Sequence, residues 1–380
     1  GYRIITNIEQ MRSVRYIRSV MLATTLAVAA ALPSCRTEEP AQPAAEEVRR
    51  EVQVGFRLAL GETQLQESRG GYDDGSGTDY ENYIDFPHHD YCVMFFDTRN
   101  RYLAAFRPTD LIPLDEDPLR SRRYDVIGRV DAPLPASFKI VVMANWHDYP
   151  RPVVGRTTIQ EICTGGNGRY DYAVPFRLSA DRTIPMYGVR LCEGVVFESD
   201  KRTYLGTIRL LRAMAKVEVK CVSKEWTIRS VSMHRYNTAG YCAPDKVYDE
   251  SDYVGEEYVK EVHVAADAAV GGLLEFERLD DGRFLLYVPE YRNTDGSGGR
   301  AGDAAEIRVK FDQRQDREYV VDFKYYDNPP EGSAVGDSFD LRRNYYYRFF
   351  VDKRPESDEM SASVDVVPYD RYDLGPVFGI

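Results

Sequence analysis

One cysteine near the start of this 380-residue chain stands where its thiol could be modified after export. Cys35 follows Leu32-Pro33-Ser34, at the end of an apolar run over residues 20–32 that several arginines precede. This is the pattern of a signal peptide: a positively charged flank, an apolar run too short to span a bilayer comfortably, and small residues at the end of that run. We therefore expect the chain to be exported, with a change of chemistry at Cys35.

Leu32-Pro33-Ser34-Cys35 resembles the lipobox of bacterial lipoproteins. The resemblance implies cleavage before Cys35 and lipid on its thiol and new amino group, which would anchor the protein in the cell outer membrane. The alternative is a plain secretory signal whose next residue happens to be cysteine. We assign residues 1–34 to the signal peptide, with residues 1–10 upstream of the first plausible start at Met11 and not translated. Residues 35–51, rich in Ala, Pro and Glu, then form a flexible lipidated tether.

The other cysteines give no metal or redox motif. None of them forms a C-x-x-C pair, which argues against a zinc site or a thioredoxin-like motif. Export permits disulfides, but the sequence does not choose a pairing, and buried free thiols fit equally well. These cysteines are Cys92, Cys163, Cys192, Cys221 and Cys242.

Signals for catalysis or ion binding are weak. His88 and His89 are adjacent, so on a strand they would face opposite ways and could not easily share an ion. Asp115-Glu116-Asp117 lacks the EF-hand spacing and its glycine. Trp146-His147-Asp148-Tyr149 could contact a sugar, although a loop that anchors its own aromatic rings is the commoner arrangement. No G-x-S-x-G, H-E-x-x-H or P-loop occurs. We expect no enzyme, no metal and no cofactor.

The composition limits the classes of molecule that this chain could bind. A net charge of -12 and a pI of about 5.1 argue against nucleic acid, where a basic face supplies most of the affinity. An apolar content of 43% is enough for real cores, and the length behind Cys35 suits two domains.

The sequence pattern predicts mainly β-strands, and these strands must position any functional residues. Val52, Val54, Phe56, Leu58 and Leu60 alternate with polar or small residues, which predicts a half-buried strand. The Gly-, Asp- and Ser-rich residues 61–83 predict an exposed loop. The pattern also predicts short helices at 108–111 and 158–162. Further strands are expected at 91–96, 102–106, 138–145, 173–178, 203–211, 214–222, 227–236, 283–288, 306–311, 318–325 and 344–351.

Many short strands separated by Gly, Pro and Asp turns indicate β-sandwiches. We therefore predict an all-β chain of two tandem β-sandwich domains of the transthyretin-like, Greek-key kind, over residues 52–211 and 212–352. Residues 353–380 form a C-terminal extension, in which Ala362, Val364, Val366 and Pro368 lie at alternate positions of a further candidate strand.

Five short phrases stand out between residues 184 and 347 of the chain. They are Ile184-Pro185-Met186-Tyr187-Gly188, Leu210-Leu211-Arg212-Ala213-Met214-Ala215-Lys216-Val217, Tyr236-Asn237-Thr238-Ala239-Gly240-Tyr241-Cys242-Ala243-Pro244, Tyr287-Val288-Pro289-Glu290 and Arg343-Asn344-Tyr345-Tyr346-Tyr347. Together they resemble the FimA-type fimbrillins of Bacteroidales, the subunits of donor-strand pili. The likeness spans residue 52 to the C-terminus, and its order and spacing matter more than any one phrase. The less regular loops and the long tether favour a minor or tip subunit.

The resemblance implies an assembly mechanism. An Arg-specific protease cuts after the first strand, that strand leaves, and the C-terminal strand of another subunit fills the groove by β-strand addition. Here the displaced strand would be 52–60 and the candidate donor 362–369. Arg69, within Ser68-Arg69-Gly70-Gly71, is the best-placed cleavage site because exposed loops of small residues are readily nicked. Arg49 and Arg50 precede the strand, so a cut there would free the lipid without opening a groove.

Each part has a plainer alternative. Arg69 could be an ordinary solvated arginine, and the tail could pair within its own domain. The whole chain could instead be a monomeric outer-membrane lipoprotein that binds a surface glycan or protein for uptake or adhesion. A glycosidase is disfavoured, although paired carboxylates need no motif. The first expectation remains a fimbrial subunit at the cell surface that supports adhesion.

Overall fold

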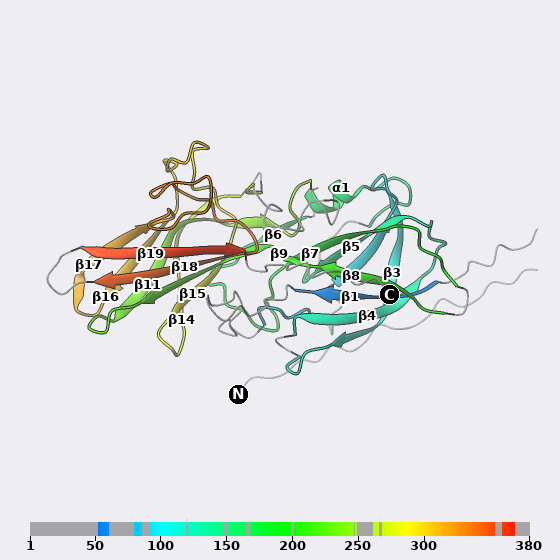
Figure 1. The fold of residues 1–380 in the computed structure, drawn as a ribbon, viewed down its shortest axis with the longest axis horizontal. Coiled ribbons are helices and arrows are strands. Elements are labelled where there is room, and N and C mark those ends of the chain that lie inside the picture. The colour runs from blue at the N-terminus through cyan, green and yellow to red at the C-terminus, as the bar shows by residue number, and fades with distance from the viewer. Residues whose placement is uncertain are drawn as a thin grey trace, which may run out of the picture. The chain divides into compact units, whose positions relative to one another are not determined.

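The computed structural model describes residues 52–60, 80–85, 91–118, 121–146, 151–164, 168–198, 201–246, 248, 261–265, 268–353 and 359–368. All of them belong to the unit Arg49–Ile380. They form nineteen strands and one six-residue helix, α1 (Ile159–Thr164), so the expected all-β class is confirmed (Figure 1). No helix in these ranges is long and apolar enough to cross a membrane.

Eight strands form one bent sheet in the order β8-β1-β4-β3-β2-β5-β7-β9. The long strand β3 links two parts of this sheet. Its residues 102–105 pair with β2, and its residues 106–113 pair with β4. The outermost strands β8 and β9 are joined by Leu210 alone, so the sheet turns back on itself around one apolar cluster. The strands are β1 (Val52–Ala59), β2 (Tyr91–Phe96), β3 (Tyr102–Pro113), β4 (Arg123–Val130), β5 (Phe138–Ala144), β7 (Met186–Cys192), β8 (Thr203–Arg209) and β9 (Leu211–Arg212).

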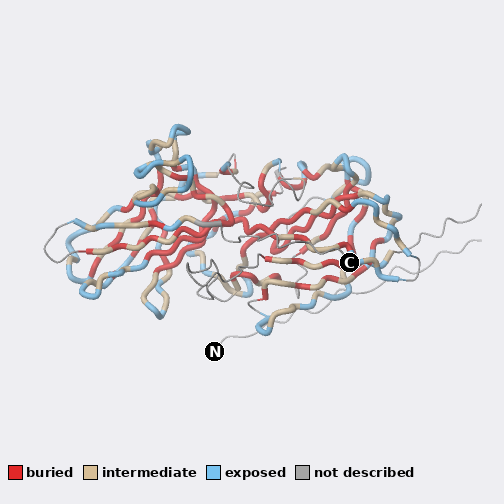
Figure 2. Tube along the Cα trace, viewed as in Figure 1, coloured by how far each residue is buried: buried red, intermediate tan, exposed pale blue. Residues whose placement is uncertain are grey.

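Strand β5 is covered on both faces, as expected for a central strand. All seven of its residues are buried (Figure 2). Because successive side chains face opposite ways, Ile140 and Val142 belong to the cluster inside the eight-stranded sheet. Val141 and Met143 belong to a second, larger cluster. The apolar run over residues 140–144 reflects this double coverage.

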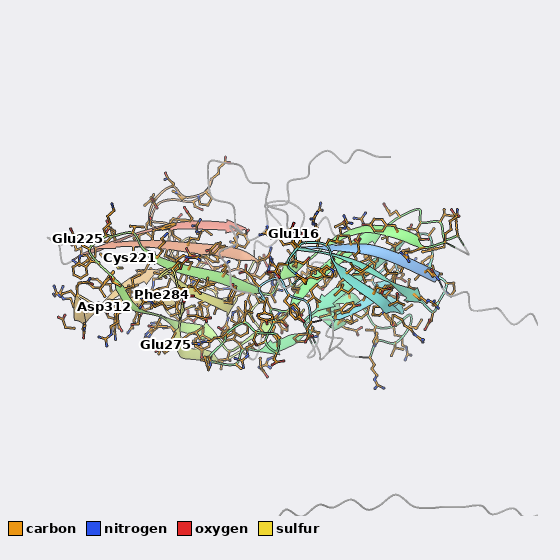
Figure 3. The ribbon with its side chains drawn as sticks, turned by 90° about the horizontal axis from the view of Figure 1, so that it is seen from below. Glu116, Cys221, Glu225, Glu275, Phe284 and Asp312 are labelled. Atoms are coloured by element: carbon orange, nitrogen blue, oxygen red, sulfur yellow. The ribbon has the colours of Figure 1, made fainter. Side chains whose placement is uncertain are left out.

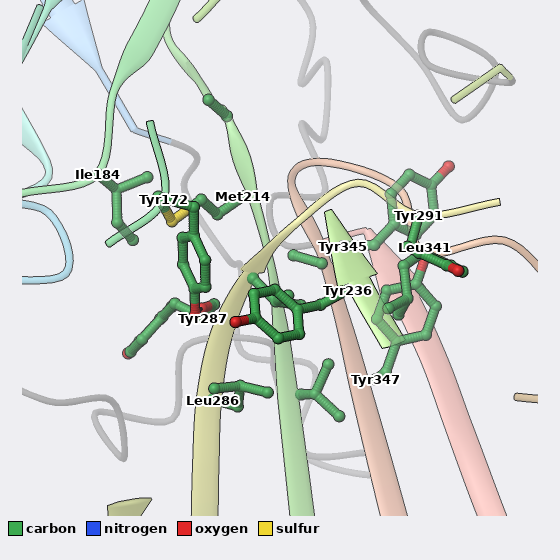
Figure 4. Close-up of a cluster of buried hydrophobic side chains, with 14 of the residues drawn as sticks. Tyr172, Ile184, Met214, Tyr236, Leu286, Tyr287, Tyr291, Leu341, Tyr345 and Tyr347 are labelled. Carbon is green, nitrogen blue, oxygen red and sulfur yellow. Dashed lines mark hydrogen bonds between the residues drawn. The ribbon is translucent and has the colours of Figure 1, made fainter. Parts of the chain in front are cut away.

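The second cluster extends from this face of the eight-stranded sheet into the space between two further sheets. In Figure 4 its tyrosines and aliphatic side chains, among them Tyr236, Leu286 and Tyr347, extend from several strands into one interior. One sheet has the order β14-β15-β10-β18-β19 and the other β13-β11-β16-β17. Their strands are β10 (Met214–Cys221), β11 (Ile228–Asn237), β13 (Val270–Glu275), β14 (Glu277–Arg278), β15 (Phe284–Pro289), β16 (Glu306–Phe311), β17 (Arg314–Asp322), β18 (Tyr345–Lys353) and β19 (Met360–Pro368).

Residues on the two sides of the predicted domain boundary at Leu211 are closely connected. Strand β6 (Arg169–Asp171) pairs with β12 (Ala239–Tyr241) to form a two-stranded sheet. The hydroxyl of Tyr172 donates a hydrogen bond of 2.6 Å to the carbonyl of Tyr287, and the larger cluster contains both residues. The division into domains 52–211 and 212–352 therefore stays a prediction.

One expected helix and one expected strand were wrong. Residues 108–111, expected as a helix, lie in strand β3, where the register against β4 shifts between Pro108 and Asp110. A proline has no N–H to donate, so it is tolerated where a ladder is irregular. Residues 173–178, expected as a strand, form no strand, and Pro175 would interrupt a ladder there for the same reason.

Candidate functional site

The first strand lies inside the sheet rather than at its edge. Strand β1 pairs antiparallel with β4 along its whole length, from Val52 opposite Val130 to Ala59 opposite Arg123. On its other side it pairs parallel with β8, with a shift in register between Gly55 and Arg57. Removing β1 would therefore leave two unpaired strand edges facing each other across an empty slot.

The side chains of β1 close the core of the eight-stranded sheet. Val54, Phe56, Leu58 and the following Leu60 are fully buried, while Val52 is only half-buried. The ring of Phe56 lies 5.4 Å from that of Phe106. Burying a large apolar side chain contributes roughly 1.5–3 kcal/mol. The four buried residues thus contribute on the order of 6–12 kcal/mol before the entropy of ordering the strand is subtracted.

The candidate donor strand pairs within its own chain. Strand β19 runs antiparallel to β18, with Val364 opposite Phe349 and Pro368 opposite Tyr345. Val364 is buried against the larger cluster, and Ala362 and Val366 are partly buried against it. The alternative that the tail pairs within its own domain is the arrangement in this structure.

The two strands are held to different degrees. Strand β1 has a neighbour on each side and four buried apolar side chains, counting Leu60. Strand β19 lies at the end of its sheet, so within the described residues it has the single neighbour β18, and of its side chains described there only Val364 is fully buried. The tail is therefore the easier of the two to detach.

Residues 80–85 begin inside the predicted exposed loop 61–83 but are tied into the fold by buried polar groups, and Glu81 and Asn82 are buried rather than exposed as expected. The amide of Asn145 donates to the carbonyls of Tyr83 and Ile184, each at 2.8 Å, and its oxygen accepts from the N–H of Asp85. Tyr124 donates to the carbonyl of Asn82. Residues 80–85 are thus held by contacts other than those of β1, although only residues 61–79 separate them from Leu60 in sequence.

The same segment supplies one half of a buried ion pair. The ammonium of Lys216, on β10, lies 3.0 and 3.1 Å from the two carboxylate oxygens of Glu81, and both side chains are almost completely buried. Tyr287 donates to the same carboxylate at 2.5 Å, and the ring of Tyr346 lies 4.5 Å from the ammonium. The guanidinium of Arg212 also contacts the side chain of Asn82.

Sequence reasoning missed this pair. The available signal was Lys216 within the apolar strand Met214-Ala215-Lys216-Val217, because a charged residue buried in a strand needs a partner. A second pair of this kind joins Arg343 and Glu290 at 2.8 Å, where Arg343 also donates to the carbonyl of Cys242. Lys216, Glu290 and Arg343 lie in phrases that carried the family resemblance, whereas Glu81 does not, and both pairs have structural roles in this fold.

Several predicted site residues lie outside the described residues. These are Cys35, Arg69, Arg49, Arg50, His88, His89 and Tyr369. Asp115, from the acidic loop, is engaged by its own chain, since it accepts from Arg123 at 2.8 Å and from the N–H of Arg122. Across the described ranges, no three His, Cys, Asp or Glu side chains gather in a way that could hold a metal ion.

The described cysteines are all free thiols. Cys163 and Cys242 are fully buried, and burial raises the pKa of Cys163 to about 12 and that of Cys242 well above its usual value. Cys221, labelled in Figure 3 at the end of β10, is partly exposed. Because the thiolate is the reactive form, Cys163 and Cys242 should be inert in the folded protein.

We expect alkylation to distinguish these thiols. In folded protein at neutral pH, iodoacetamide should modify Cys221 and spare Cys163 and Cys242. Raising the pH to 10 should leave Cys163 protected, because its pKa of about 12 still keeps it protonated. Peptide mapping by mass spectrometry, with guanidinium-unfolded protein as the control, measures each site. Equal modification of all three in the folded protein would contradict the burial described.

The sequence matches no known protein-family profile and no curated protein. Among solved structures, the tip fimbrial protein Mfa3 from Porphyromonas gingivalis, with a C-terminal truncation, superposes with a TM-score of 0.54 at 13% sequence identity. The match covers 83% of this chain and 99% of that chain. This chain has the fold of that tip fimbrial protein. The fold implied by the sequence resemblance is therefore the fold found.

Two further solved structures resemble this chain more loosely. A putative cell adhesion protein from Parabacteroides distasonis has a TM-score of 0.49 at 17% identity, over 85% of this chain and 98% of the other. The fimbrial anchor protein Mfa2 from Porphyromonas gingivalis has a TM-score of 0.37 at 11% identity, over 83% of this chain and 98% of the other.

Proposed function

We propose that this chain is a non-enzymatic structural subunit of a cell-surface fimbria that assembles by protease-triggered strand exchange and supports adhesion. The observation that carries the proposal is the position of β1, which is inserted between β4 and β8 and fills the core of its sheet. The likeness to a tip fimbrial protein supports a fimbrial role. In this proposal Cys35 carries the lipid, and the uncut lipoprotein stays at the outer membrane.

Cleavage at Arg69 would separate β1 and the lipid from the rest of the chain in one event. The residues after the cut would stay in place, because residues 80–85 are anchored by Asn145 and by the Lys216–Glu81 pair. The slot between β4 and β8 would then accept the 362–369 strand of another subunit, with backbone hydrogen bonds on both sides. Its partners would be other fimbrial subunits and an Arg-specific protease.

The proposal is tested by assembly after limited cleavage. The chain from Cys35 onward is treated with an Arg-specific protease, and the products are separated by size and sequenced at the N-terminus. We expect a new N-terminus at Gly70 and concentration-dependent oligomers. Arg69→Gln should abolish both, while the matched Arg49→Gln/Arg50→Gln variant should still assemble.

The donor role of the tail is tested by two neighbouring substitutions. Val364→Asp places a charge on the buried face of β19, and Asp365→Asn changes only its exposed face. After cleavage, the first variant should lose assembly by tenfold or more and the second should assemble normally. Normal assembly by chains truncated after Lys353 would refute a donor in the tail.

A further inference from the structure

A pocket of about 330 Å³ lies where the end of β5 meets β6 and the segment that leads into β7. This volume is at the lower end of the usual range for ligand sites, so it suits a small ligand. Neither β1 nor β19 contributes to it, so the pocket is separate from the proposed strand exchange. Its principal lining residues are Trp146, Arg169, Tyr170, Phe176, Asp181 and Arg182.

Aromatic rings form the apolar part of the lining. Trp146 lies two residues after the end of β5, and its ring meets that of Tyr170 edge-on, with centroids 6.4 Å apart. Phe176 is partly exposed and stacks on Tyr172 at 5.1 Å, which fixes the orientation of its ring. The guanidinium carbon of Arg182 lies 5.9 Å from the centre of the Phe176 ring. Rigid rings of this kind offer apolar contact to a flat ligand at little entropic cost.

One buried donor beside the pocket lacks an acceptor. Trp146 is 4% exposed, and its indole N–H has no hydrogen-bond partner among the described residues. The hydroxyl of Tyr170, by contrast, donates to the carbonyl of Ala213 at 3.2 Å. Buried polar groups are nearly always paired, and tryptophan N–H groups usually find an acceptor.

The polar lining carries both signs of charge. Asp171 and Asp181 are exposed at the rim, and Arg169 pairs with Asp171 at 2.6 Å. Arg182 donates to the carbonyl of Pro175. A strongly charged ligand would meet like charge somewhere in this lining, whereas hydroxyl groups both donate and accept and can use carboxylates and guanidinium groups together. We propose that the pocket binds one or two neutral sugar rings.

The inference is tested with the full chain and a tryptophan reporter. The chain has two tryptophans, so Trp226→Phe leaves Trp146 as the single indole. This protein is titrated with the methyl glycosides of glucose, galactose, mannose, fucose and N-acetylglucosamine. We expect at least one to change Trp146 emission saturably, with a millimolar or lower dissociation constant.

Variants in the lining link binding to the pocket. Phe176→Ala and Asp181→Asn should each weaken binding by tenfold or more, and the distant exposed Val196→Ala should not. Trp146→Ala removes the largest ring of the lining and the fluorescent reporter together, so its loss of binding is read from saturation-transfer NMR of the sugar. Because Asp181 is exposed, the Asp181→Asn variant is expected to fold. It therefore still tests the pocket if the Phe176→Ala variant fails to fold.

Three results would overturn the inference. The first is that none of the five glycosides binds by fluorescence or NMR. The second is an unchanged affinity in both Asp181→Asn and Phe176→Ala. The third is binding restricted to charged sugars such as glucuronic acid. The measurement uses uncut monomer. A failure of strand exchange therefore leaves its outcome unaffected, and a failure to bind sugar leaves the assembly test unaffected.

Discussion

Replacing Phe56 by alanine should reduce the free energy of unfolding by about 3–5 kcal/mol, the usual cost of deleting a buried phenylalanine side chain. Phe56 is 1% exposed, lies in the middle of β1 and packs against Phe106. The slot around it is formed by strands on both sides, so its walls can collapse little into the cavity. Urea denaturation followed by circular dichroism gives the difference from the wild-type chain.

The control is the next residue on the same strand. Arg57 is more than a third exposed and pairs with Asp125 at 2.9 Å, and exposed pairs of this kind contribute less than about 1 kcal/mol. Arg57→Ala should therefore have a small effect. If both variants lost the same stability, β1 would not fill the core as described, and the basis for strand exchange would fail.

The second large effect is expected at the buried ion pair between the segment 80–85 and β10. Lys216→Met should cost about 3–5 kcal/mol, because it leaves the carboxylate of Glu81 buried without its cation. The double variant Lys216→Met/Glu81→Leu should recover most of that loss, since an apolar pair of similar volume replaces two buried charges. A double-mutant cycle by urea denaturation measures the coupling.

An exposed pair provides the matched comparison. Lys201 and Glu198 are 2.6 Å apart, and both side chains are more than half exposed. Lys201→Met should change the free energy of unfolding by less than about 1 kcal/mol. A coupling between Lys216 and Glu81 no larger than that between Lys201 and Glu198 would show that the segment 80–85 is anchored by other contacts.

Period-two patterns predicted the strands whose alternate residues are apolar. The strand 52–60 was predicted with its buried residues, and only Val52 is more exposed than expected because it lies at the strand end. Strand β4 was missed, although Tyr124, Val126 and Val130 alternate. Gly128 interrupts that pattern at a buried position, because a Cβ there would come within 2.3 Å of the carbonyl oxygen of Arg107.

Which strands and side chains contact one another was harder to predict than where the strands lie in the sequence. The alternation of Ala362, Val364 and Val366 indicated a strand but could not identify its neighbour, because any sheet edge with an apolar face satisfies the same pattern. The Lys216–Glu81 pair joins residues far apart in sequence, and nothing in the intervening sequence specifies their distance in space. Buried charges and pocket linings depend on such long-range juxtapositions, so they became visible only in the structure.

The separate anchoring of β1 and of residues 80–85 also has a kinetic consequence. While the peptide chain between Leu60 and Tyr80 is intact, β1 is a tethered ligand for its own slot, and tethers of this kind give effective concentrations of about millimolar. Any single cut in that link turns the same contacts into a bimolecular complex that dilution weakens. In the proposed assembly, an incoming strand would then compete with a freed peptide, and the local concentration of subunits would decide which one occupies the slot.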